Sequence, residues 1–129
     1  MIQEDKILLL KDLCSRLPYY PKCEMIDELR VVNNEKDSSY ISTLFPKHIE
    51  LFSYHNNFTI KPYLRSMSNM NEEEKEEYRN IDNRSYSCPI DYAHIPASDR
   101  IDWLNAHHFD FRNLIGRGLA LEAPEGMYN

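Results

Sequence analysis

The chain has 129 residues, of which 42% are hydrophobic and 12% aromatic, so it has the length of one domain and enough apolar side chains for a core. Its 21 acidic and 15 basic residues give a formal net charge of −6, which argues against the broad basic surface that binds nucleic acid non-specifically. Its three cysteines are widely spaced and form no Cys-x-x-Cys pair, which argues against the disulfide framework of a small secreted protein.

The first predicted element is a helix over residues 3–17. Its apolar side chains recur at three- and four-residue steps and therefore share one face: Ile7, Leu10, Leu13, Cys14 and Leu17. Pro18 ends this helix, because a residue before proline is pushed out of the α region. This pattern places Cys14 in the core, and the strand that follows is expected to place Cys23 there too.

The N-terminal segment carries no targeting or membrane signal that we recognise. Its apolar run at residues 7–10 is far shorter than the roughly 20 residues of a membrane span, and it lacks the basic start of a signal peptide. We therefore expect a cytoplasmic chain without a membrane segment, which forms a single domain over residues 1–129.

A central antiparallel meander of three or four strands is predicted over residues 22–61. Apolar and polar side chains alternate over residues 22–32, and residues 40–45 are rich in β-branched and aromatic types. Residues 49–54 and 58–61 predict a third and a fourth strand, joined by a tight turn. An SH3-like barrel is one way to close such a sheet, and the pattern alone leaves closure open.

The sequence after residue 62 predicts helices and an extended tail. Asn71 suits the N-cap of a helix with Glu74 at its third position, and the acidic run 72–77 suits the positive end of the helix dipole. Residues 80–97, which contain two prolines, predict an ordered loop before a second helix capped by Ser98. With the tail over residues 119–127, the predicted fold class is α+β: an N-terminal helix, a central antiparallel meander, C-terminal helices and an extended tail.

Metal-ligating side chains gather in the last third of the chain: Cys88, His94, His107, His108 and Asp110. Thiolate, imidazole and carboxylate are all competent ligands. However, neighbouring helical residues point about 100° apart, so His107 and His108 do not readily share an ion unless the helix ends between them. We expect no metal and no other cofactor, keep the five residues as weak candidates, and expect one of the two rings to pack near Trp103.

No catalytic residue is assigned. Cys88 and His94 form the only local pair of a nucleophile and a base, and no nucleophile-elbow or cysteine-enzyme signature surrounds them. All three glycines lie at or after residue 116, so no glycine-rich phosphate loop can be written.

Three stretches are candidates for contact with a partner. Glu73 and Glu76 belong to the acidic run, for which a merely solvated helix face is the alternative. Leu121 and Met127 belong to the tail, which is rich in small and apolar residues. The third stretch, residues 61–65, has Tyr63 and Arg65, and its mix of cations with an aromatic is found in single-strand nucleic-acid grooves, although a packed strand end with a surface arginine is the favoured explanation.

Several stretches resemble a family of small uncharacterised proteins from Bacteroides-type gut bacteria, often encoded in prophages or other mobile elements. The stretches are LLLKDLCSRLPY at residues 8–19, KPYLRSMSNMNEEE at 61–74, WLNAHHFDFR at 103–112 and GLALEAPEGMY at 118–128. They cover roughly half of the chain and carry no known activity. The resemblance implies a bacterial cytoplasm and a connection to phage biology.

These observations favour a non-enzymatic protein-interaction or regulatory accessory module of a bacterial mobile element, with a protein partner. A nucleic-acid-binding protein is the alternative, and a small metalloprotein or enzyme that uses the region of His107 and His108 is the second alternative. The sequence does not predict an oligomeric state.

Overall fold

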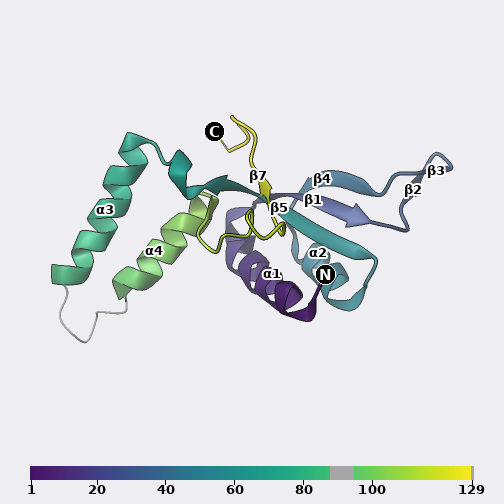
Figure 1. The fold of residues 1–129 in the computed structure, drawn as a ribbon, viewed down its shortest axis with the longest axis horizontal. Helices are drawn as coiled ribbons and strands as arrows, with labels where there is room; N and C mark the ends of the chain where they lie inside the picture. Colours follow the sequence, from purple (N-terminus) through teal and green to yellow (C-terminus); the bar gives the residue numbers. More distant parts are fainter. Residues whose placement is uncertain (88–94, 129) are drawn as a thin grey trace.

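The structure, a computed structural model, describes residues 1–87 and 95–128 of the chain, and the side chains of these residues outside 82–98. It is an α+β fold in which an N-terminal helix and a second helix lie on one side of an open sheet, and a helical hairpin extends from one end (Figure 1). The elements follow in this order: α1 (Gln3–Arg16), η1 (Leu17–Tyr19), β1 (Lys22–Asp27), β2 (Val31–Val32), β3 (Glu35–Lys36), β4 (Ser39–Thr43), α2 (Pro46–Tyr54), β5 (Phe58–Ser66), η2 (Met67–Asn69), α3 (Glu72–Ser87), α4 (Ile95–Ala106), β6 (Phe109–Asp110) and β7 (Leu121–Glu122).

The main sheet has the strand order β4-β1-β5-β6, with β7 also paired to β5. β1 is antiparallel to both β4 and β5, whereas β6 and β7 run parallel to β5. β2 and β3 form a separate two-stranded ribbon that projects from the other end of the molecule (Figure 1). Over the described residues the sheet is open and forms no closed barrel, so the SH3-like closure considered from the sequence is not found.

The prediction of a strand over residues 49–54 is wrong, because this segment belongs to α2. Pro46 occupies the first turn, where its missing N–H costs nothing. The N–H of Phe45 donates to His48 Nδ1 over 3.0 Å, and His48 and Phe52 are buried one turn apart. α2 lies between β4 and β5 in the chain, and β5 pairs with β1 rather than with β4, so the strands do not form a simple meander.

The buried face of α1 also differs from the predicted one. Ile7 and Cys14 are exposed, whereas the buried positions are Leu9, Asp12, Leu13 and Arg16. The prediction failed for Cys14 because apolar spacing cannot anticipate a charged pair inside the core. Cys23 on β1 is buried as expected, and its burial raises the pKa of its thiol to about 12.

Where the structure describes residues 80–97, the predicted loop is helical instead, since α3 runs to Ser87 and α4 begins at Ile95. Ser98 therefore lies inside α4 instead of capping it, and Pro96 stands in the first turn, where proline is tolerated. The predicted cap of α3 is confirmed: Asn71 Oδ1 accepts the N–H of Glu74 over 2.8 Å, and Glu74 Oε1 accepts the N–H of Asn71 over 3.1 Å.

One hydrophobic core joins the sheet to the helices on its covered face. It unites Leu9 and Leu13 of α1 with Cys23, Met25, Leu44, Phe52, Phe58, Ile60, Leu64, Leu114, Leu119 and Ala120. On β5 the buried residues alternate with half-buried ones, so Thr59, Lys61 and Tyr63 lie on the face that α1 and α2 leave uncovered. None of the helices in the described ranges has the length and apolar character of a membrane span.

Candidate functional site

Strand β4 lies at one edge of the main sheet. Its five residues, Ser-Tyr-Ile-Ser-Thr, include no charge and no proline. Sheet proteins commonly protect an edge from pairing with other chains by charged side chains, proline or a very short strand. β5 has Lys61 and Pro62 within it, whereas β4 has none of these protections over its length. The edge of β4 is therefore a ready position for a further strand.

The backbone of β4 presents unpaired groups on this edge. The N–H of Leu44 donates to the carbonyl of Pro21 over 2.9 Å. With the strand register, this bond shows which residues direct their backbone N–H and C=O toward β1. Because inward and outward groups alternate along an antiparallel strand, the remaining residues direct their N–H and C=O outward: Ser39, Ile41 and Thr43. The Thr43 carbonyl accepts the Ser42 hydroxyl, and for Ile41 the described residues offer no partner on that side. Ile41 also exposes 58% of its surface.

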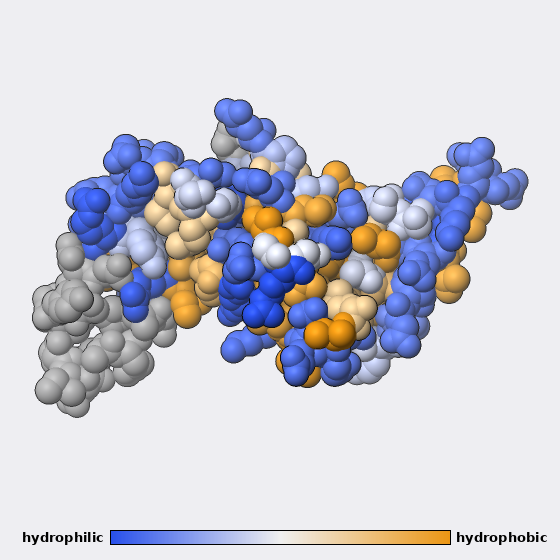
Figure 2. All heavy atoms as spheres, viewed as in Figure 1, coloured by the Kyte–Doolittle hydropathy of each residue, from blue (hydrophilic) through white to orange (hydrophobic). Residues whose placement is uncertain are grey.

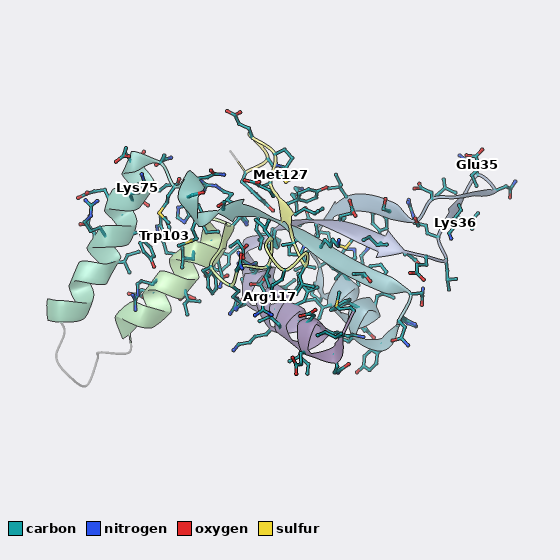
Figure 3. The ribbon with its side chains drawn as sticks, viewed as in Figure 1. Glu35, Lys36, Lys75, Trp103, Arg117 and Met127 are labelled. Atoms are coloured by element: carbon teal, nitrogen blue, oxygen red, sulfur yellow. The ribbon has the colours of Figure 1, made fainter. Side chains whose placement is uncertain are left out.

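A projecting hairpin arm, formed by β2 and β3, lies beyond the N-terminal end of β4. Its turn residues, Asn33 and Asn34, both have positive φ (52° and 64°), as a tight two-residue hairpin requires. Glu35 and Lys36 at its tip lie far from the rest of the molecule (Figure 3). At its base and on β2, Leu29 is 75% and Val31 62% exposed. A two-stranded ribbon with exposed apolar side chains is marginally stable alone, so contact with a partner would stabilise it.

Two further exposed apolar side chains lie at the opposite, C-terminal end of β4. Tyr20, which has a left-handed backbone (φ 54°), is 65% exposed, and Phe45 is 43% exposed. The bond between Leu44 and Pro21 brings their segments together. We use the name β4 surface for the edge of Ser39–Thr43 with these flanking side chains: Tyr20, Leu29, Val31, Ile41 and Phe45. Figure 2 shows hydrophobic side chains among hydrophilic ones along the arm.

The residues predicted from the sequence lie elsewhere, and several of them meet around a cleft of about 720 Å³. The walls of this cleft come from β5, the start of α3, the end of α4 and the tail, with Arg65, Glu74, His107, His108 and Tyr128 among the lining residues. Arg65 donates to both carboxylate oxygens of Glu74 over 2.8 and 2.7 Å, and this bond lowers the pKa of Glu74. Arg65 is thus already engaged in joining the sheet to α3.

The adjacent histidines have different surroundings. The His107 ring stacks on Trp103 at 4.0 Å between centroids, as expected for one of the two, and Trp103 extends from α4 toward α3 (Figure 3). His108 has a left-handed backbone (φ 63°) and stacks on Tyr128 at 3.7 Å. Burial, with the positive charges of Arg16 and Arg65 nearby, lowers the pKa of His108 to about 4. Its ring is therefore neutral at physiological pH.

Asp110 has a structural role in this region. Its carboxylate oxygens accept the N–H groups of Leu114 over 2.8 Å and Ile115 over 3.0 Å, which holds the turn after β6. In the ranges that the structure describes, no cluster of three or more potential ligands could hold a metal ion. The remaining candidates, Cys88 and His94, lie outside the described residues.

The predicted contact residues are divided between exposed and docked positions. Glu73 and Glu76 are exposed on α3, and Glu76 pairs with Arg79 over 2.7 Å. Leu121 and Met127 are half-buried, because the tail is docked: β7 pairs with β5, and Met127 lies beside it (Figure 3). Tyr63 supplies the carbonyl that accepts the Tyr128 hydroxyl over 2.7 Å.

Sequence reasoning missed the β4 surface. It assigned a strand to residues 40–45, but whether a strand lies at an edge depends on long-range pairing. One signal was available, namely an uncharged strand next to a polar turn, and it is too common to identify a site. Comparisons of the chain with protein-family models, with curated proteins and with solved structures found no match.

Proposed function

We propose that this chain is a non-enzymatic protein-interaction module, which binds an extended segment of a partner protein along the edge of β4. The observation that carries the proposal is the outward-facing backbone of Ser39, Ile41 and Thr43 on an uncharged edge. In strand addition, main-chain hydrogen bonds supply affinity and alternate side chains supply specificity. The module would bind its partner without any catalytic group.

The surroundings of this edge support the same function. Apolar side chains stand exposed in its middle and at both of its ends, where a bound strand and its flanking residues would cover them. The ion pair between Arg30 and Asp37 (3.0 Å) and the position of Arg30 over the Tyr40 ring (4.5 Å) support the base of the arm. The arm can therefore contact one end of the added strand.

The biological setting that we propose comes from the resemblance alone. The stretches shared with mobile-element proteins of Bacteroides-type bacteria favour an accessory or regulatory role in the cytoplasm of such a host. The partner would then be a protein of the mobile element or of the host.

The test compares three baits in lysate of such a host: the wild type, Ile41→Lys, and the control Thr59→Lys. Thr59 lies on the same uncovered face but on β5, so its variant adds the same charge away from the edge. The proposal expects a protein that the wild type and Thr59→Lys recover and Ile41→Lys loses. That protein, once purified, must slow amide exchange within β4. Equal recovery by all three baits would contradict the proposal.

Nucleic-acid binding is the second candidate, favoured by Lys61 and Tyr63 on the uncovered face of β5. The net charge of −6 and the engagement of Arg65 by Glu74 weigh against it. This function predicts that a single-stranded oligonucleotide binds at low salt and is released steeply as salt rises. Absence of binding at low salt would exclude it.

A further inference from the structure

We infer that the strand bound at the β4 edge belongs to β4 of a second copy of this chain, so that the two sheets join across a two-fold axis through Ile41. This inference rests on the proposed function and names the partner. Isologous two-fold dimers are the commonest oligomers, and they require a surface that is complementary to itself. Three properties of the β4 surface meet this requirement.

The first property is the register of the outward backbone groups. An axis through Ile41 places Ile41 opposite its own copy and Ser39 opposite Thr43 of the second copy. These are the residues whose N–H and C=O point outward, so all three positions can form hydrogen-bonded pairs. An axis through Tyr40 would instead leave Thr43 opposite Asp37, outside the strand, and an axis between two residues would oppose outward groups to inward ones.

The second property is charge. Across a two-fold axis every residue near the centre meets its own copy, so a charged residue there would meet a like charge. No residue from Ser39 to Thr43 is charged. The exposed Ile41 would meet the copy of itself on the uncovered face, and each Ser39 hydroxyl would meet a Thr43 hydroxyl, a favourable cross-strand pair.

The third property is the placement of exposed apolar side chains at opposite ends of the strand. Leu29 and Val31 belong to the arm side, which adjoins the N-terminal end of β4, whereas Tyr20 and Phe45 lie at its C-terminal end. Antiparallel alignment brings the arm of each copy toward the Tyr20 and Phe45 end of the other. A five-residue edge alone buries little surface, and these contacts would extend it toward the roughly 1,200 Å² of a stable interface.

The experiment is sedimentation equilibrium of the full chain over a wide concentration range. The inference expects the wild type and Thr59→Lys to have twice the chain mass. Ile41→Lys should dimerise about a hundred-fold more weakly, because two lysines then face each other. Mixing Ile41→Lys with Ile41→Glu should restore the dimer as a mixed species, since only a two-fold axis at residue 41 places these two side chains opposite one another.

Melting curves verify that each variant is folded, and Ser39→Lys provides a second substitution at an outward-facing position. A wild type that stays monomeric at all concentrations, or a dimer that both Ile41→Lys and Ser39→Lys leave intact, would overturn the inference. These outcomes are distinct from failure of the proposed function. A monomer that loses a different partner protein through Ile41→Lys retains the proposed function and excludes only the second copy.

Discussion

Asp12 and Arg16 lie one turn apart on α1, both side chains are completely buried, and Arg16 Nε donates to Asp12 Oδ2 over 2.8 Å. The other oxygen of Asp12 accepts a bond from Arg112 over 2.6 Å, and a second nitrogen of Arg16 donates to the carbonyl of Phe109 over 2.8 Å. This pair therefore joins the first helix to the chain that follows α4.

Replacing Asp12 by Asn should destabilise the protein by about 3–5 kcal/mol, because it leaves the buried Arg16 without its counter-charge. Urea unfolding followed by circular dichroism measures the change in free energy. Asp5→Asn is the matched control on the same helix. The ion pair of Asp5 with the half-exposed Arg117 is long, at 3.9 Å, and should contribute little to stability. Equal midpoints for the two variants would show that the buried pair does not stabilise the fold.

Glu74→Gln should weaken the attachment of α3 to the sheet. The change removes a charge-assisted pair with Arg65, and such bonds contribute about 1.5–3 kcal/mol. We expect faster amide exchange in the first turn of α3, measured by mass spectrometry, whereas Glu73→Gln, at an exposed neighbour, should leave exchange unchanged. If both variants exchange alike, Arg65 does not hold this helix.

Tyr128→Phe should loosen the C-terminal tail. The Tyr128 hydroxyl donates to the carbonyl of Tyr63 over 2.7 Å and accepts the N–H of Lys22 over 2.8 Å, so its loss should cost roughly 1–3 kcal/mol of docking. Limited proteolysis should then remove the tail faster. Tyr54→Phe, at a side chain that is 80% exposed, is the control. Unchanged cleavage would mean that stacking on His108 alone keeps the tail in place.

The stability of the fold should fall as the pH drops from 6.5 toward 4. The pKa of His108 is about 4 in the folded chain and 6.5 when unfolded, so in this window the unfolded state binds more protons. His108→Asn, which tolerates the left-handed backbone, should lose part of this slope in melting temperature. Burial also lowers the pKa of His48, which contributes to the pH dependence of both the wild type and His108→Asn. The difference between their slopes therefore reports on His108. Identical slopes in the wild type and in His108→Asn would contradict the low pKa of His108 in the folded chain.

Local rules predicted the parts of this fold that depend on neighbouring residues. The first helix, the strand from Lys22 and the reciprocal cap of Asn71 and Glu74 all follow from spacing, propensity and capping chemistry within a few positions. The same rules misassigned α2, because its β-branched and aromatic residues suit a strand as well as a helix face. Pro46, which marks the first turn, was interpreted only as an interruption.

The candidate site depends on contacts between distant parts of the chain, which local patterns do not contain. Arg16 lies on an apolar-looking helix, yet its burial requires Phe109, far along the sequence. Likewise, the edge position of β4 follows from the pairing of β1 with β5 across α2. Pattern and composition therefore led to the expectation of a binding function, but they did not point to the surface that we propose for it.

Hydrogen exchange of the β4 amides, measured at low and at high protein concentration, tests the central claim most directly. The account predicts that the outward N–H groups of Ser39, Ile41 and Thr43 exchange quickly in dilute protein and become protected as concentration rises, in the wild type and not in Ile41→Lys. Fast exchange of these amides at every concentration, with and without any captured partner, would contradict the claim that β4 is an interaction edge.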